Sequence, residues 1–185
     1  MRKLLLIALL TIQSLVTYSL VINDGPTPKT ILAHAFTPTE VKQQMEQEKK
    51  QIKYDAAENV AARVLRRHGC NDEFAEVIGH AAVDEGLNPR VVAAVTIVES
   101  TCNPNARSHD AVGLMQVSPK TWHYTVKDLL NPAFNVTHAT RILANYVHRF
   151  GLEEGLHHYN GLGVGCGACD DQYVGKVLRA AGYTT

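Results

Sequence analysis

The chain has 185 residues, of which 45% are hydrophobic and 19% are charged, and its formal net charge is +0. These values are typical of one compact globular domain with additional segments. A neutral chain also lacks the excess of basic residues that captures nucleic acid electrostatically, so nucleic acid is excluded as a partner.

The N-terminus has the pattern of an export signal. Arg2 and Lys3 precede an apolar run that extends to Ile22, which is the order of charged and hydrophobic regions in a signal peptide. The run is also nearly long enough to span a bilayer. We therefore interpret residues 1–22 as a signal peptide, or alternatively as a membrane anchor through residues 4–22. We expect the chain to be exported to the periplasm or cell envelope.

A linker and the start of a long helix are predicted next. Residues 23–36 contain one glycine and two prolines and show no hydrophobic periodicity, which is typical of a linker. Thr37 and Glu40 then form the pattern of a capping box, with Pro38 at the first helical position. We therefore expect a helix to begin directly after Thr37.

This first helix is expected to be long and charged, with only a thin apolar stripe. The stripe contains Val41, Met45, Ile52, Ala56, Val60 and Val64. We expect the first half to stand off the domain as an arm and residues 56–68 to pack on the core. The predicted organisation is therefore a linker and charged helical arm over residues 23–55, followed by a domain over residues 56–185.

The rest of the chain is predicted to be helical. Several helices are expected to begin at an Asn or Ser residue followed by proline and to end near a glycine. No segment alternates every second residue in the manner of a half-buried strand. The expected helices begin near Asn71 or Asp72 and at Asn88, Ser118 and Asn131, and cover residues 152–160 and 171–181. The domain is therefore predicted to be all-α.

Glu99 lies where a hydrophobic residue is expected. It follows Val92 and Val95 at helical spacing, so in a helix it shares the face that enters the core. Burial and the partial negative charge at the end of a helix both raise the pKa of a carboxyl group. A carboxyl that keeps its proton near neutral pH can act as a proton donor. A solvent-facing glutamate in the last turn of the helix is the alternative.

A polar loop follows Glu99, and a similar polar segment occurs much later in the chain. The loop contains Ser108 and ends at Gly113-Leu114-Met115-Gln116. We expect it to fold back over the helix end and set a hydroxyl, an amide and backbone groups opposite the acid, which suits a glycan. Tyr159 and Asn160 end a later helix, and a tyrosine hydroxyl there is expected to hydrogen-bond the acid.

Four cysteines are expected to form disulfides in an exported protein. They are Cys70, Cys102, Cys166 and Cys169, and all three of their pairings are open. The spacing of Cys166 and Cys169 also fits a redox pair or half of a metal site. No second such pair and no ordered pair of histidines accompanies it, so we expect no metal site.

Three segments occur together in an informative order: Glu99-Ser100, Gly113-Leu114-Met115-Gln116 and Tyr159-Asn160. In this combination the chain resembles the soluble-type lytic transglycosylases, relatives of goose-type lysozyme that cleave peptidoglycan. The resemblance covers roughly residues 75–182 and implies a lysozyme-like multi-helix domain. The chain departs from the family pattern at Thr101-Cys102, where an aromatic residue often follows, and at Asp110, which replaces a frequent glycine.

The resemblance implies roles for the matching residues. Glu99 is implied to be the catalytic acid and then the base, and Tyr159 is implied to orient it. The implied substrate-binding residues are Ser108, Gly113, Met115, Gln116 and Asn160, with Met115 as an apolar floor. The alternatives are that Leu114 and Met115 are core residues, that Asn160 is a helix cap and that Ser108 is a loop hydroxyl.

The expected reaction depends on the number of carboxylates. Most glycosidases use two carboxyl groups, about 5 to 9.5 Å apart, and the only other acid between Glu99 and Gln116 is Asp110. The resemblance implies instead a one-acid cleavage of the MurNAc-GlcNAc β-1,4 bond of peptidoglycan, giving 1,6-anhydro-muropeptides without a cofactor. Lysozyme-type hydrolysis of the same bond is one alternative.

A second alternative is a non-catalytic peptidoglycan-binding subunit of an envelope or phage assembly. The expected partners are peptidoglycan glycan strands, together with an envelope-spanning secretion or conjugation machine or a phage particle. The N-terminal segment is expected to contact the membrane if it is retained.

Overall fold

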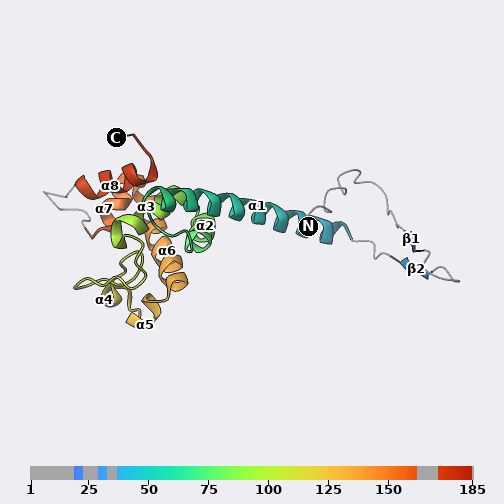
Figure 1. The fold of residues 1–185 in the computed structure, drawn as a ribbon, viewed down its shortest axis with the longest axis horizontal. Helices are drawn as coiled ribbons and strands as arrows, with labels where there is room; N and C mark the ends of the chain where they lie inside the picture. The colour runs from blue at the N-terminus through green and yellow to red at the C-terminus, as the bar shows by residue number, and fades with distance from the viewer. Residues whose placement is uncertain (1–18, 23–28, 33–36, 162–170, 185) are drawn as a thin grey trace. The chain divides into compact units, whose positions relative to one another are not determined.

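The computed structural model describes residues 19–22, 29–32, 37–161 and 171–184 (Figure 1). The contacts within the chain define two compact units, Met1–Glu48 and Lys49–Thr185. Most of the predicted export segment, residues 1–18, lies outside the described residues. Among the residues that are described, no helix combines the length and the apolar character needed to cross a membrane.

The first unit contains a short pair of strands that the sequence pattern did not predict. Strands β1 (Ser19–Ile22) and β2 (Lys29–Leu32) pair antiparallel, with Ser19 opposite Leu32 and Ile22 opposite Lys29. β2 therefore falls inside the predicted linker, and β1 ends the predicted apolar segment. Backbone groups alone can pair two strands of four residues, so a pair can form without an alternating side-chain pattern.

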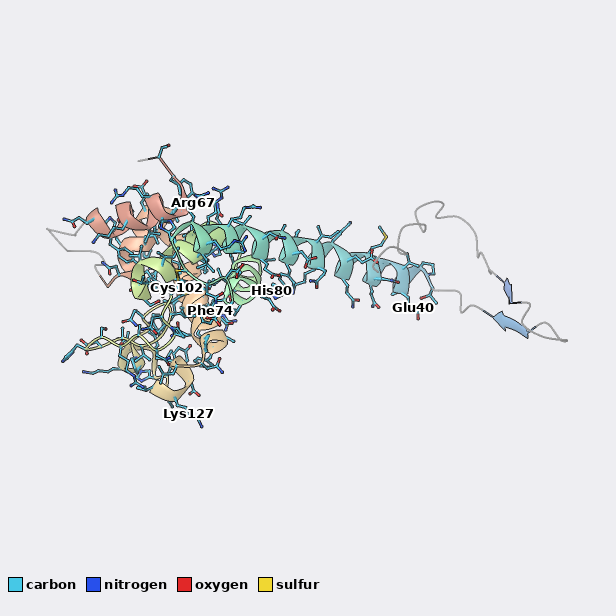
Figure 2. All side chains as sticks on the ribbon, viewed as in Figure 1. Glu40, Arg67, Phe74, His80, Cys102 and Lys127 are labelled. Carbon is cyan, nitrogen blue, oxygen red and sulfur yellow. A yellow bond between two sulfur atoms is a disulfide. The ribbon has the colours of Figure 1, made fainter. Side chains whose placement is uncertain are left out.

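Helix α1 (Pro38–Arg67) begins at the predicted capping box. The Thr37 backbone N–H donates to Glu40 Oε2 at 2.6 Å, and the Glu40 N–H donates to Thr37 Oγ1 at 3.3 Å. All side chains from residue 37 to residue 53 are exposed, and Ala57 is the first buried residue. Figure 2 shows the side chains of this exposed part projecting from the helix. Burial thus begins close to the predicted residue 56.

The predicted apolar stripe of α1 is partly wrong. The side chains of Val41, Met45, Ile52 and Ala56 are exposed, and the buried residues are Ala57, Ala61, Ala62, Val64 and Leu65. The reason is a close approach by helix α2 (Ala75–Asp84). A Cβ atom at Gly79 of α2 would lie 2.5 Å from the backbone nitrogen of Glu58. The packed face of α1 therefore combines small side chains near Gly79 with the larger Val64 and Leu65 further along the helix.

The second unit is helical, which confirms the predicted all-α domain. Its remaining helices are α3 (Pro89–Ser100), α4 (Pro119–Trp122), α5 (Val126–Leu129), α6 (Pro132–Phe150), α7 (Leu152–Tyr159) and α8 (Asp171–Ala181). The side chains of Asn88, Ser118 and Asn131 accept hydrogen bonds from backbone N–H groups of the helices that follow them, at 3.0 to 3.2 Å. The predicted starts of these three helices are therefore confirmed.

Two details of the helix starts differ from prediction. Asn71 Oδ1 accepts a hydrogen bond from the Glu73 backbone N–H, so it caps a turn that precedes α2, and Phe74 directly precedes that helix. Helix α5 was not predicted, because its cap Thr125 is not followed by proline. The Thr125 hydroxyl accepts from the Asp128 backbone N–H at 3.0 Å.

Helix α3 lies in the core of the second unit. Every residue from Val91 to Thr96 is buried. Helix α3 packs against α2 and α8, and α6 packs against α2, α5 and α7 (Figure 1). The buried end of the unit is therefore built around the helix that carries Glu99.

Candidate active site

Glu99 lies in the last turn of α3. Val92 and Val95 of the same helix are fully buried, which confirms that their face enters the core. Glu99 itself is half-buried. Burial raises the pKa of its carboxyl, because a charged carboxylate loses hydration in this environment. The predicted shift of this acid toward its protonated form is therefore confirmed.

The hydrogen-bond partner of Glu99 is Tyr173 of α8. The Tyr173 hydroxyl donates to Glu99 Oε1 at 2.6 Å, and Tyr173 is only 7% exposed. This bond favours the ionised carboxylate and lowers its pKa, but the effect of burial is larger and the pKa of Glu99 stays raised. Tyr173 was not among the residues to which the sequence pattern or the family resemblance assigned a role.

The expectation that the Tyr159 hydroxyl donates to Glu99 is wrong. The Tyr159 hydroxyl donates instead to the backbone carbonyl of Met115 at 2.7 Å. Tyr159 ends α7, from which its hydroxyl reaches the loop, whereas α8 packs along α3 and brings Tyr173 to the acid. Burial and the charge of Glu99 both raise the pKa of Tyr159, so the two groups are electrostatically coupled. An orienting role for Tyr159 remains a prediction.

Both tyrosines are held in their neutral form. Burial, followed by the charge of Glu99, raises the pKa of Tyr173 and of Tyr159 well above the usual value of tyrosine. A neutral phenol is a hydrogen-bond donor. The site therefore combines one carboxyl group with two hydroxyl donors.

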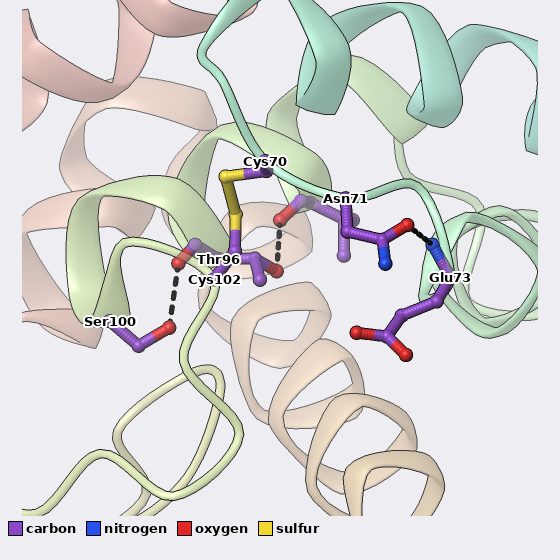
Figure 3. The surroundings of a disulfide bond; sticks show 7 residues. Cys70, Asn71, Glu73, Thr96, Ser100 and Cys102 are labelled. Carbon is purple, nitrogen blue, oxygen red and sulfur yellow. Dashed lines mark hydrogen bonds between the residues drawn. A yellow bond between two sulfur atoms is a disulfide. The ribbon is translucent and has the colours of Figure 1, made fainter.

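The loop after α3 begins with a disulfide between Cys70 and Cys102 (Figure 3). The pairing of these two cysteines was one of the options left open by the sequence. Cys166 and Cys169 lie outside the described residues. The first two residues after α3, Thr101 and Cys102, both have left-handed backbones, with φ of 52° and 63°.

The Gly113–Gln116 segment is fixed by Asn135 of α6. Asn135 is fully buried; its Nδ2 donates to the carbonyls of Val112 and Leu129 at 2.9 and 3.0 Å. Its Oδ1 accepts from the Met115 backbone N–H at 2.9 Å. A Cβ at Gly113 would lie 2.3 Å from Asn135 Nδ2, so glycine is needed for this close approach. No sequence pattern indicated this role of Asn135.

Gly113, Leu114 and Met115 are buried, and Met115 has no exposed surface. The Thr140 hydroxyl lies 3.9 Å from the Met115 sulfur in the core. A side chain without exposed surface cannot touch a ligand in this conformation. Met115 therefore fits the core interpretation rather than the predicted apolar floor, and its backbone carbonyl is what meets Tyr159.

The side chains of the remaining predicted substrate-binding residues are partly or fully accessible to solvent. Gln116 has a left-handed backbone with φ of 48°, and its Nε2 donates to the carbonyls of Gly113 and Ala106 at 2.9 and 3.2 Å. Ser108 and Asn160 are exposed. Asn160 is the C-cap of α7, which agrees with the cap alternative. Sugar binding by these three residues remains a prediction.

The structure also contains a cavity away from these residues. It has a volume of about 600 Å³, lies between α2 and α6, and is lined by residues that include Phe74, His80 and Arg141. None of the predicted site residues lines it. Within the described part of the chain, no group of three or more metal-ligating side chains is gathered in one place.

Comparisons with known proteins identify the family of the domain. Residues 76–169 match the transglycosylase SLT domain. A protein named "Transglycosylase" from Enterobacteria phage PRD1 is 34% identical to the chain over 109 residues. The match covers 56% of this chain and only 41% of the phage protein. Glu99, Gly113–Gln116, Asn135 and Tyr159 all fall inside the matched domain, and the chain belongs to the transglycosylase SLT domain family.

Proposed function

We propose that the chain is a peptidoglycan lytic transglycosylase that cleaves the MurNAc-GlcNAc β-1,4 bond with Glu99 as its single catalytic carboxyl. The observation that carries this proposal is the state of Glu99, which is half-buried with a raised pKa at the end of α3. Membership of the transglycosylase SLT domain family supports peptidoglycan as the substrate.

The first step uses Glu99 as an acid. Its protonated carboxyl gives the proton to the glycosidic oxygen, and the bond between this oxygen and C1 of MurNAc breaks. The N-acetyl oxygen of the same MurNAc stabilises the positive charge that develops at C1. The raised pKa of Glu99 supports this step, because the carboxyl is protonated over a wider pH range than an exposed glutamate.

The second step uses Glu99 as a base. The carboxylate formed in the first step removes the proton of the MurNAc C6 hydroxyl, and the C6 oxygen bonds to C1 as the N-acetyl oxygen leaves. The proton returns to Glu99 and the product is a 1,6-anhydro sugar. Tyr173 supports the ionised state between the steps, because its hydroxyl donates to Glu99 Oε1 at 2.6 Å.

A one-carboxyl mechanism is supported by the surroundings of Glu99. The influences on its pKa are burial and the Tyr173 hydroxyl, and no second carboxylate of the described residues is among them. Asp110 has a side chain that is 80% exposed and pairs with His109 at 2.9 Å. Asp110 is therefore a poor candidate for the second carboxylate that hydrolysis requires.

The decisive experiment is a digest of purified peptidoglycan analysed by mass spectrometry. We expect anhydromuropeptides from the intact chain and from an Asp110→Asn variant. Products with reducing ends alone would assign lysozyme-type hydrolysis, and loss of activity in Asp110→Asn would indicate a second catalytic carboxyl. Binding to wall material without soluble fragments would assign a non-catalytic subunit.

A metal or redox module built on Cys166 and Cys169 makes different predictions. It requires bound zinc or a thiol-dependent activity, whereas the proposed reaction requires neither. Elemental analysis and a count of free thiols on the purified chain separate these functions.

We also propose export to the periplasm or cell envelope and a role in a phage particle. Export is supported by Arg2, Lys3 and the apolar run after them, and by the Cys70–Cys102 disulfide, because such bonds persist in oxidising compartments. The phage origin of the PRD1 relative favours the particle over a secretion or conjugation machine. Both proposals are tested by looking for the protein in envelope fractions and in purified particles. Mass spectrometry of its N-terminal peptide then shows whether the export segment has been removed.

A further inference from the structure

We propose that the Cys70–Cys102 disulfide is a positioning element for the catalytic acid. It holds the two residues after α3 in a strained backbone conformation and thereby keeps the last turn of that helix, with Glu99, in place. This inference rests on the proposed function of Glu99, and it assigns a role in the reaction to a bond that joins Cys70, outside the matched residues 76–169, to Cys102 within them.

The backbone after Glu99 is strained at two consecutive positions. Thr101 and Cys102 have φ of 52° and 63°, and neither is glycine. L-residues adopt this left-handed region at a cost in free energy, and a β-branched residue such as threonine is especially disfavoured there. Two such residues in a row persist only when the surrounding structure holds them.

The disulfide supplies that support from a fixed point. Cys70 lies just after α1, and its backbone N–H donates to the carbonyl of the fully buried Leu65 at 3.0 Å. The bond joins this position to Cys102 across 32 residues of sequence, with Cα atoms 6.0 Å apart. Figure 3 shows that it links the chain after α1 to the chain after α3.

The last turn of α3 depends on the two residues after it. No basic side chain lies in this turn to interact with the helix dipole, and the capping residue is Thr101 rather than glycine. The Thr101 N–H still donates to the Ile97 carbonyl at 2.9 Å, and the Ser100 hydroxyl donates to the Thr96 carbonyl at 3.1 Å. Glu99 lies between these contacts, so relaxation of the left-handed residues would loosen the turn that carries the acid.

A loosened last turn of α3 would change the pKa of Glu99 as well as the orientation of its carboxyl group. The titratable groups that face it are Tyr173 of α8 and Tyr159 of α7. A mobile last turn would break the 2.6 Å bond from Tyr173 and admit water to the carboxyl. Loss of the Tyr173 bond alone would raise the pKa of Glu99, but burial is the larger influence on that pKa. Hydration therefore lowers the pKa overall, and the acid would lose its proton at lower pH.

The test compares two disulfide-free variants of the full chain that differ at one position. They are Cys70→Ala/Cys102→Ala and Cys70→Ala/Cys102→Gly. Variants are preferable to a reductant, because Cys166 and Cys169 also respond to reducing conditions. Turnover on purified peptidoglycan is measured across pH at a temperature at which circular dichroism shows each variant to be folded.

We expect turnover of the alanine variant to fall about tenfold, the size of effect that small displacements of a catalytic group produce. The alkaline limb of its pH profile should move to lower pH. The glycine variant should recover most of the rate and of the profile, because glycine adopts the left-handed conformation without the cost.

Equal rates and equal alkaline limbs for the two variants would overturn the proposal, as would an alanine variant that matches the wild type. If the wild type itself releases no anhydro product, the proposed function fails instead. If neither variant folds, the proposal is tested by the Tm of a Thr101→Gly variant that keeps the disulfide. It should raise the Tm by relieving strain, and an unchanged or lower Tm would contradict the inference.

Discussion

The ends of α2 and α3 each carry a carboxylate that accepts a 2.6 Å hydrogen bond from a tyrosine hydroxyl. Tyr54 donates to Asp84 at the end of α2, and Tyr173 donates to Glu99 at the end of α3. The pKa values of the two acids nevertheless shift in opposite directions. The pKa of Asp84 is lowered, mainly by its bond from Tyr54, whereas burial raises the pKa of Glu99.

The opposite pKa shifts of Asp84 and Glu99 come from their exposure to solvent and from nearby charge rather than from the tyrosines. The side chain of Asp84 is 50% exposed and lies 3.2 Å from Lys50 Nζ. Glu99 is half-buried, and no cationic side chain is among the causes of its pKa shift. The same hydrogen bond stabilises the charged form in both places, and hydration decides which way the pKa moves. Of these two acids, only the one at the end of α3 keeps its proton to higher pH than an exposed carboxyl does.

Neutralising the two acids should produce the largest contrast. Glu99→Gln should reduce the release of soluble muropeptides by at least about a thousandfold, because an amide cannot donate and recover the proton. Asp84→Asn is the matched control. It should keep the wild-type rate within about twofold, because Asp84 pairs with Tyr54 and Lys50 away from the acid.

Equal activities of Glu99→Gln and Asp84→Asn would contradict the distinction between the two acids. A Glu99→Gln variant that keeps most of its activity would show that another group carries the proton. The release of soluble fragments from labelled cell walls measures both variants under the same conditions.

Removing the tyrosine hydroxyl that donates to Glu99 should have the next largest effect. Tyr173→Phe deletes the bond that lowers the pKa of Glu99, so that pKa should rise further and the alkaline limb of the pH profile should move to higher pH. The rate at the optimum should fall about tenfold because the carboxyl loses its orientation. A pH series of initial rates measures both changes.

Tyr159→Phe is the matched variant for this test. Its hydroxyl donates to the Met115 carbonyl and makes no bond to Glu99 in this structure, so the alkaline limb should stay near its wild-type position. A shift in Tyr159→Phe without one in Tyr173→Phe would reverse the roles of the two tyrosines. The orienting role implied for Tyr159 by the family resemblance would then hold.

The parts of the site that sequence predicts are those encoded by local spacing. Val92, Val95 and Glu99 share a helical face, and this spacing was enough to place the acid at the edge of the core. Asparagine or serine followed by proline located the starts of α3, α4 and α6, because the side chain and the ring both favour the first turn. These signals act within a few residues, so no knowledge of the fold is needed.

The parts that sequence did not predict depend on which helices meet. The helix over residues 171–181 was predicted, but local spacing does not say which neighbour a helix packs against. The contact of α8 with α3 gives Tyr173 its hydrogen bond to Glu99. Asn135 makes three hydrogen bonds to segments that are distant in sequence or outside its helix. The close approach of α1 at Glu58 depends on Gly79, which lies on another helix. Each of these is a property of packing between elements.

The smallest predicted effect concerns stability, and here the two acids should differ in sign. The pKa of Glu99 is higher in the folded state than in the unfolded state. The folded state therefore binds more protons between the two pKa values, and stability falls as the pH rises through this window. Glu99→Gln removes that loss, so it should raise the free energy of unfolding at about pH 8 by about 1 kcal/mol, or the Tm by about 2–4 °C.

Asp84 should behave in the opposite way, because its folded pKa is lowered. Its ionised form adds stability above the unfolded pKa, and this contribution is lost as the pH falls through the folded pKa. Asp84→Asn should therefore lower the Tm slightly at about pH 8, by an amount equivalent to no more than about 0.5 kcal/mol for so exposed a pair. Thermal unfolding repeated at about pH 3, below the usual pKa of both carboxyl groups, should reduce both differences. A Glu99→Gln variant less stable than the wild type at about pH 8 would mean that the carboxylate is stabilised by its surroundings, and burial would no longer explain its raised pKa.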